Sequence, residues 1–141
     1  MGGGSVGSFA DADQPGKQIA VVLNHASTFA LTRKAVHAKL IGSELPDSAF
    51  ELLRSGTVDA FAAPREQLLD YATRLAGSQV LPEGYGINNA GIAIKKGQPG
   101  RLAFTREFVE QAKASGQVAG IIARGNLRGF RVAPRADTTP P

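Results

Sequence analysis

The sequence predicts an α/β fold, a three-layer sandwich in which helices cover both faces of a mainly parallel sheet. Short apolar segments rich in β-branched residues alternate with amphipathic segments of about ten residues, which is the pattern of consecutive βαβ units. The first such segment, residues 17–23, is apolar almost without interruption, as expected of a strand buried on both faces. Because βαβ crossovers are right-handed, successive helices can cover both faces of the sheet.

Capping and turn residues divide the first half of the chain into elements. Ser27 or Thr28 is expected to cap the helix after the first strand, and Gly56 and Gly77 are expected to end the next two helices. Pro64 should stop the third strand, because proline cannot donate to a sheet ladder. We predict strands at residues 17–23, 39–45, 57–64 and 78–83, and helices at residues 29–38, 46–56 and 65–77.

The second half of the chain is mainly helical in its pattern. Leu102, Phe104 and Phe108 recur at helical spacing and predict a long helix. We expect helices at residues 101–116 and 117–127, and extended segments at residues 87–97 and 128–134.

Composition excludes several classes of site and partner. The 141 residues include 16 Lys and Arg against 12 Asp and Glu, and the basic residues are scattered, so we expect no nucleic-acid partner. The absence of cysteine excludes disulfides and thiolate metal sites. His25 and His37 lack a third ligand at a familiar spacing, so we expect neither a metal nor a cofactor. No apolar run is long enough to span a membrane, so we expect no membrane insertion.

Five segments of the chain follow one another in a specific order and spacing. They are "DQPGKQIAVVLNHASTFAL", "AFELLRSGTVDAFAAPREQLL", "LAGSQVL", "NNAGIAIKKGQP" and "EFVEQAKASGQVAGIIARGNLRGFRVAP". Together, from about Asp13 to Pro134, they resemble the second lobe and C-terminal section of the family 3 solute-binding proteins of bacterial ABC transporters.

That resemblance implies a fold and an organisation. In the family, two α/β lobes joined by hinge strands clamp a solute between them, and nothing in this sequence corresponds to the first lobe. The resemblance also implies a periplasmic location and an ABC permease as partner, although the chain shows no signal peptide. We expect a flexible leader at residues 1–13, an α/β ligand-binding lobe at residues 14–87, a return strand and C-terminal helices that normally pack on the first lobe at residues 88–134, and a disordered tail at residues 135–141.

The apolar residues of the C-terminal helices need a cover that the first lobe would normally give. Phe104, Phe108 and Ile121 would otherwise form an exposed patch, and such patches promote association. We therefore expect a homodimer, in which exchange of this segment between two copies is one arrangement. The alternative is a monomer in which the segment folds back on its own lobe.

Ser27 and Thr28 are the first candidates for contact with a ligand. They follow a strand and open a helix, and the N-terminus of a helix offers unpaired N–H groups to an anion. Open α/β sheets bind ligands at the carboxyl ends of their strands. In the resembled family this turn contacts the carboxylate of an amino-acid ligand. The alternative is a plain helix cap.

A second group of candidates follows the third strand. In the family, the aspartate equivalent to Asp59 ends a strand near the cleft, and an acidic residue five positions later commonly pairs with the ligand's ammonium group. Pro64 stands at that position here, which argues against an ordinary α-amino acid as ligand. Arg65 could instead meet an anionic group of the solute.

A polar cluster lies beside the expected second hinge. Tyr85, Asn88 and Asn89 carry groups that donate and accept hydrogen bonds, which suits a small polar solute. Asparagine also suits turns, so a purely structural role is the alternative.

Two functions from different classes follow from these residues. The first is a binding module for a small polar or anionic solute with no chemistry of its own. The second is an enzyme on the same scaffold, a hydrolase of anionic esters or a dehydratase-like lyase, with His25 and Ser27 as catalytic residues in a dimer cleft. Against the second, "NHASTF" does not match the G-x-S-x-G nucleophile motif.

Overall fold

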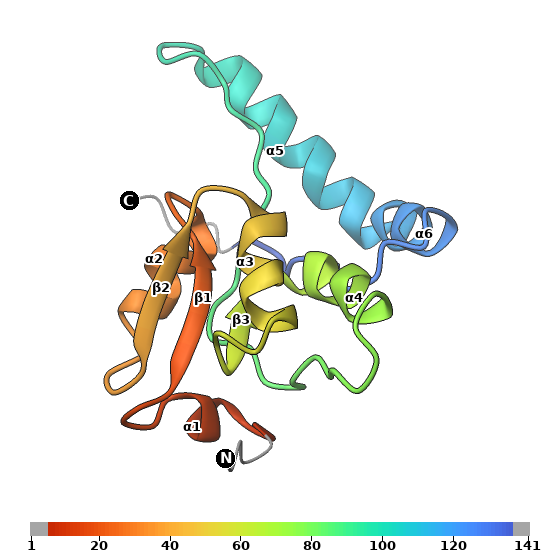
Figure 1. Ribbon diagram of the computed structural model, residues 1–141. Helices are drawn as coiled ribbons and strands as arrows, with labels where there is room; N and C mark the ends of the chain where they lie inside the picture. Colours follow the sequence, from red (N-terminus) through yellow and green to blue (C-terminus); the bar gives the residue numbers. More distant parts are fainter. Residues whose placement is uncertain (1–5, 137–141) are drawn as a thin grey trace. The chain divides into compact units, whose positions relative to one another are not determined.

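The computed structural model describes residues 6–136, which form two compact units, one ending at Asn88 and the other beginning at Asn89 (Figure 1). The remaining parts of the expected leader and tail, residues 1–5 and 137–141, lie outside the described residues. The first unit contains α1 (Phe9–Ala12), β1 (Gln18–Val22), α2 (Ala26–Thr32), β2 (Lys39–Ser43), α3 (Pro46–Arg54), β3 (Ala60–Ala62) and α4 (Arg65–Thr73). The second contains α5 (Pro99–Ala114) and α6 (Gln117–Arg124).

The sheet of the first unit has three parallel strands in the order β2-β1-β3. Its central strand pairs on both sides, so that Ile19 lies opposite Leu40 of β2 and Ala60 of β3. Each strand is followed by a helix, and the predicted α/β class with a parallel sheet is confirmed.

Two apolar clusters cover the two faces of this sheet. Side chains alternate along β1, so Ala20 and Val22 face one cluster while Ile19 and Val21 face the other. The first cluster is closed by α3 and α4, whose Phe50 and Tyr71 rings stack with centroids 4.7 Å apart. The second is closed by α1 and α2, through Ala12 and Leu31. Helix layers on both faces make the predicted three-layer sandwich.

Asp13 ties the N-terminal segment to the loop before β2. Its carboxylate accepts the backbone N–H groups of Val36 at 3.0 Å, His37 at 2.9 Å and Ala38 at 2.8 Å. The preceding helix α1 buries Ala12. Residues 6–13 are thus folded against the lobe, which differs from the flexible leader expected there, because the sequence gives no local sign of the Asp13 contacts.

Other differences from the predicted elements have similar tertiary causes. Helix α2 ends at Thr32 instead of continuing to residue 38, because the N–H groups of residues 36–38 bond Asp13 instead of helix carbonyls. Residues 78–83 form no strand, since the carbonyls of Leu81 and Pro82 accept hydrogen bonds from a side chain. The extended segments at residues 87–97 and 128–134 also carry no strand pairing.

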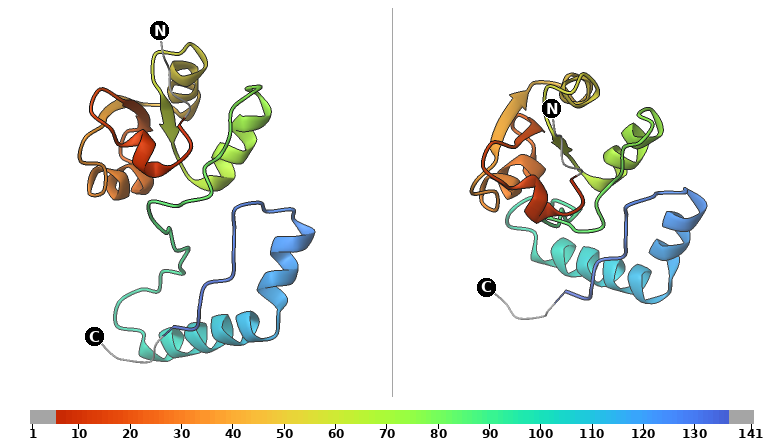
Figure 2. Two further views of the ribbon diagram at one scale, coloured as in Figure 1. Left: turned by 90° about the horizontal axis from the view of Figure 1, so that it is seen from below. Right: turned by 60° about the horizontal axis from the view of Figure 1, so that its bottom comes forward.

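The second unit consists of α5, α6 and the segments that flank them. Gly116 adopts a positive φ of 77° at the turn between the helices, so α6 runs at an angle to α5 (Figures 1 and 2). Neither helix has a buried side chain. Large apolar side chains are exposed at Ile92, Leu102, Phe104, Phe108, Ile121, Leu127 and Phe130. In the described part of the chain, no helix is both long and apolar enough to cross a membrane.

The Asp13 contacts predict a pH-dependent stability. Backbone N–H groups, first that of Val36, hold the pKa of Asp13 below its ordinary value of 3.8. A carboxyl whose pKa falls on folding stabilises the fold above its unfolded pKa, and this contribution is lost as the pH falls through the folded pKa. Asp13→Asn keeps one acceptor oxygen but loses the charge. We expect a lower melting temperature than the parent at pH 7, with the difference shrinking below pH 3.8.

Glu44 provides a matched control, because its side chain is exposed and forms no hydrogen bond within the described structure. Glu44→Gln should leave the melting temperature close to that of the parent at both pH values. If Asp13→Asn lowers the melting temperature by the same amount at neutral and at acid pH, the proposed role of the carboxylate is wrong.

Candidate functional site

The turn from β1 into α2 places Ser27 and Thr28 in the first turn of the helix. Asn24 adopts a left-handed φ of 61°, which asparagine tolerates and which turns the chain sharply after β1. The N-cap is His25, and no side chain caps the helix. The predicted cap at Ser27 or Thr28 is therefore wrong. The helix begins earlier than expected, because the His25 carbonyl accepts the N–H groups of Thr28 and Phe29.

The two hydroxyl groups of this turn have different environments. The Thr28 Oγ1 donates to the Val22 carbonyl at 2.6 Å, so it fastens the first turn of the helix to the end of the strand. Ser27 is almost entirely buried, with 6% of its surface exposed. Ser27 is thus shielded from solvent, whereas Thr28 is half-buried.

Tyr85 lies next to Ser27 at this edge of the sheet. Its side chain packs against the second apolar cluster, and its hydroxyl donates to the Ala63 carbonyl at 3.4 Å, just beyond β3. Burial raises the pKa of Tyr85, and an interaction with the Ser27 hydroxyl acts in the opposite direction. The structure thus brings Ser27 and Tyr85 together at the carboxyl ends of β1 and β3. Their role in contact with a ligand stays a prediction.

Arg65 is the first residue of α4 and lies at the same edge of the sheet. Its Nη2 donates to the carbonyls of Leu81 at 2.7 Å and Pro82 at 2.8 Å. The guanidinium therefore holds the loop that follows α4. The Lys34 ammonium adds a longer bond of 3.4 Å to the Gly84 carbonyl. Contact of Arg65 with an anionic solute stays a prediction.

The remaining predicted ligand residues lie at the junction of the two units. Asn88 ends the first unit and Asn89 begins the second, and both are exposed. Their role stays a prediction.

The catalytic alternative is not assembled in this state. Within the described structure, no hydrogen bond joins the His25 imidazole to Ser27, whose hydroxyl meets Tyr85 instead. Asp59 lies at the opposite edge, before β3, where its carboxylate accepts from Lys17 Nζ at 2.8 Å and from the Gln18 N–H at 2.9 Å. The expectation that Asp59 ends a strand near the cleft is therefore wrong, because it fixes the amino end of β1.

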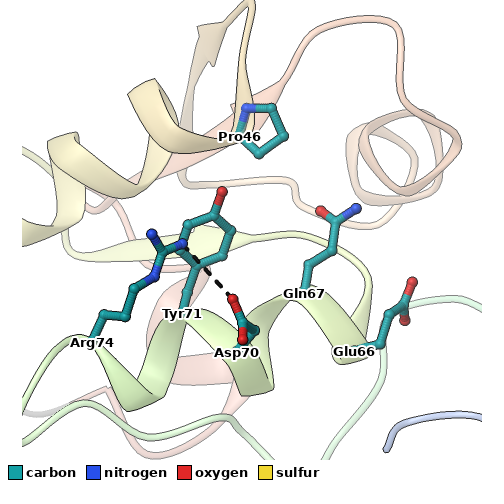
Figure 3. A pocket seen from close by; sticks show the side chains of 6 residues that line it. All are labelled: Pro46, Glu66, Gln67, Asp70, Tyr71 and Arg74. Atoms are coloured by element: carbon teal, nitrogen blue, oxygen red, sulfur yellow. Dashed lines mark ion pairs between the residues drawn. The ribbon is translucent and has the colours of Figure 1, made fainter. Parts of the chain in front are cut away.

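A hollow of about 380 Å³ on the face of α3 and α4 was not foreseen from the sequence (Figure 3). The Arg74 guanidinium lies 4.2 Å from the centre of the Tyr71 ring, and the Tyr71 hydroxyl donates to Asp47 at 2.8 Å. The hollow is lined by Pro46, Glu66, Gln67, Asp70, Tyr71 and Arg74. Only the i, i+4 pair of Asp70 and Arg74 could have been recognised in the sequence. Among the described residues, no three His, Asp or Glu side chains are grouped to hold a metal ion.

Comparison with solved structures identifies the fold. No family model matches the sequence, and no curated protein matches it. An ancestral amino-acid-binding protein, described as a precursor of cyclohexadienyl dehydratase, superposes with a TM-score of 0.64 and 26% identity over 85% of this chain and 51% of that chain. An ancestral arginine-binding protein bound to glutamine superposes with a TM-score of 0.63 and 26% sequence identity over 90% of this chain and 56% of that chain.

A third structure, an ancestral cyclohexadienyl dehydratase, has a TM-score of 0.51 at 20% identity and shows the fold alone. The chain spans about half the length of the solved proteins that it matches. The similarity to the solute-binding fold inferred from the five sequence segments is confirmed.

The bond from Thr28 to Val22 predicts a local stability effect. Thr28→Val keeps the shape of the side chain but removes the hydroxyl, so we expect a loss of about 1 kcal/mol in the free energy of unfolding, measured by urea denaturation. Thr28→Ser retains the donor and should lose less. A loss in Thr28→Ser as large as or larger than the loss in Thr28→Val would contradict the role of the hydroxyl.

Proposed function

We propose that this chain is a solute-binding lobe that takes a small polar or anionic solute at the carboxyl ends of β1 and β3. The observation that carries the proposal is its similarity, over 85% to 90% of the chain, to ancestral proteins described as binding amino acids. Ligands of open parallel sheets bind at this edge, outside the ends of the strands.

The side chains at this edge supply suitable groups. Ser27 and Thr28 offer hydroxyls, and Tyr85 offers a phenol that can both donate and accept. Arg65 uses one terminal nitrogen for the loop carbonyls, and a guanidinium has further N–H donors for a carboxylate. Asn88 and Asn89 are proposed as further contacts from the sequence alone.

Pro64 and Arg65 favour an anionic solute. Pro64 replaces the acidic residue that would pair with an ammonium group in the resembled family, and the next residue is a cation. We propose that the carboxylate, more than the amine, of an amino acid or related acid is recognised.

The resemblance supports two further parts of the proposal. The partner of a complete receptor would be an ABC permease, and its location would be the periplasm. A complete clamp also needs a second α/β lobe, and this chain spans about half of the matched structures. We therefore propose weak binding by this chain alone, because closure of two lobes normally buries the solute.

A homodimer is proposed from the second unit. Phe104 is 71% exposed and Phe108 is 55% exposed on α5, and Ile121 is 51% exposed on α6. Contiguous exposed apolar surface of this kind marks association sites. We propose that a second copy covers these residues, with or without exchange of the segment.

The enzymatic alternative has less support. A hydrolytic unit would need the His25 imidazole within hydrogen-bond reach of Ser27, whereas Ser27 is buried and interacts with Tyr85. A dehydratase-like lyase rests only on the fold that it shares with one matched structure.

Solute binding is testable by an NMR titration of the amide signals with glutamine, glutamate and arginine. We expect dissociation constants of about 1 mM, that is, a binding free energy of about −4 kcal/mol, with the largest shifts at Ser27 and Thr28. Ser27→Ala should weaken binding, and Ser55→Ala, at the far end of α3, should not. Shifts confined to the hollow between α3 and α4, or no shifts at all, would contradict the proposed site.

Association is testable by sedimentation velocity at micromolar concentration. We expect a dimer for the parent chain and a monomer for the double variant Phe104→Lys, Phe108→Glu, because charges in the covered patch oppose burial. Val36→Lys changes an apolar side chain that is 78% exposed in the first unit and should leave the dimer intact. A parent chain that sediments as a monomer would exclude the association.

A further inference from the structure

We propose that Arg65 is a positioning residue that holds residues 81–86 across the sheet edge, and that Tyr85, carried by this strap, determines which solutes reach Ser27. The inference rests on the proposed function for its solute-related part. Its structural part rests on contacts within the first unit and can be tested without any solute.

Arg65 fixes the near end of the strap. Residues 78–83 form no strand, so no sheet ladder holds them in place. Pro82 has no N–H to donate, and its carbonyl is held at 2.8 Å by the same Nη2 that holds the Leu81 carbonyl at 2.7 Å. Because Arg65 begins α4 shortly after β3 ends at Ala62, these two bonds tie the strap to the end of the sheet.

Close packing on α2 fixes the far end. A Cβ atom added at Gly86 would lie 3.0 Å from the Ala30 Cβ, so the backbone of the strap approaches the helix as closely as glycine allows. Lys34, two residues after the end of α2, donates to the Gly84 carbonyl at 3.4 Å. Tyr85 therefore lies between two fixed points, and its side chain is directed to the corner between β1 and β3.

The Tyr85 hydroxyl occupies the position where a polar group of a solute would be recognised. It donates a hydrogen bond to the Ala63 carbonyl, just beyond the end of β3, and it contacts Ser27, beyond the end of β1. The bond to Ala63, at 3.4 Å, is long and therefore weak, so a solute can exchange it at little cost. A solute must either bind the phenol itself or displace it, and in both cases its size is limited by the ring.

The chain supplies its own spectroscopic probe for the strap. It contains no tryptophan and two tyrosines, Tyr71 and Tyr85, so Tyr71→Phe leaves Tyr85 as the only fluorescent and titrating phenol. In that background we expect a pKa for Tyr85 above its ordinary value of 10.0 and slow quenching of its fluorescence by acrylamide, because the ring is partly buried.

Arg65→Ala in this background should release the strap. We expect the Tyr85 pKa to fall toward its ordinary value and acrylamide quenching at neutral pH to increase. Arg65→Lys, which keeps the charge but lacks the forked donors, should give intermediate values. Arg54→Ala removes an arginine that pairs with Glu51 on α3 and should change neither reading. Circular dichroism identifies any variant that has unfolded, and Arg65→Lys then provides the comparison.

Tyr85→Ala tests the selection of solutes. We expect arginine to gain affinity relative to glutamine by about tenfold or more, because removal of the ring leaves space for the longer side chain, and a difference of one methylene in a pocket already gives about tenfold or more. An unchanged ratio of the two affinities would overturn the selective role of Tyr85.

The outcomes separate this inference from the proposed function. If Arg65→Ala leaves both the Tyr85 pKa and the quenching unchanged, the positioning role is wrong, whether or not a solute binds. If both readings change but no solute shifts the Ser27 amide in the parent or in Tyr85→Ala, Arg65 positions the strap and the proposed solute site is wrong.

Discussion

The apolar run of β1 is the constraint on which the first unit depends. Ile19, Ala20, Val21 and Val22 expose at most 3% of their surfaces, although they point alternately to opposite faces of the sheet. A central strand of this kind needs cover on both sides, and parallel neighbours require crossovers that supply it. Because the strands are parallel, their carboxyl ends lie at the same edge of the sheet. The burial of the central strand thus also creates the edge at which the polar residues lie.

Polar side chains at that edge already form hydrogen bonds with the backbone. The Thr28 hydroxyl closes the turn after β1, the Tyr85 hydroxyl satisfies the end of β3, and Arg65 satisfies two loop carbonyls. If a solute binds at this edge, as proposed, it must exchange hydrogen bonds instead of adding them, and the net gain from exchange is small. In the proposed function, tight binding would need additional contacts from a second wall, which is consistent with the weak binding proposed for this chain alone.

The sequence predicted what depends on local patterns and missed what depends on contacts between distant residues. The parallel sheet, its helices and the solute-binding fold followed from periodicity and from five ordered segments. The cap of α2 was misplaced, because a backbone carbonyl of His25, and not a hydroxyl, receives the first N–H groups. Asp59 was placed at the wrong edge, since its partners Lys17 and Gln18 lie about forty residues earlier in the chain. No local pattern predicts that Tyr85 lies next to Ser27.

The two units have opposite charge and different sources of stability. Residues 1–88 hold seven Lys and Arg against nine Asp and Glu, whereas residues 89–141 hold nine against three. Both described apolar clusters belong to the first unit, and α5 and α6 bury no side chain. The opposite charges on two copies attract each other only within about 8 Å at physiological ionic strength. They can orient the two copies as they meet but supply little of the free energy of association. In the proposed dimer, burial of Phe104 and Phe108 would supply that energy, because removal of apolar surface from water is the dominant favourable term in association. The second unit would then depend for its order on a partner, whereas the first already has the core that positions Ser27 and Tyr85.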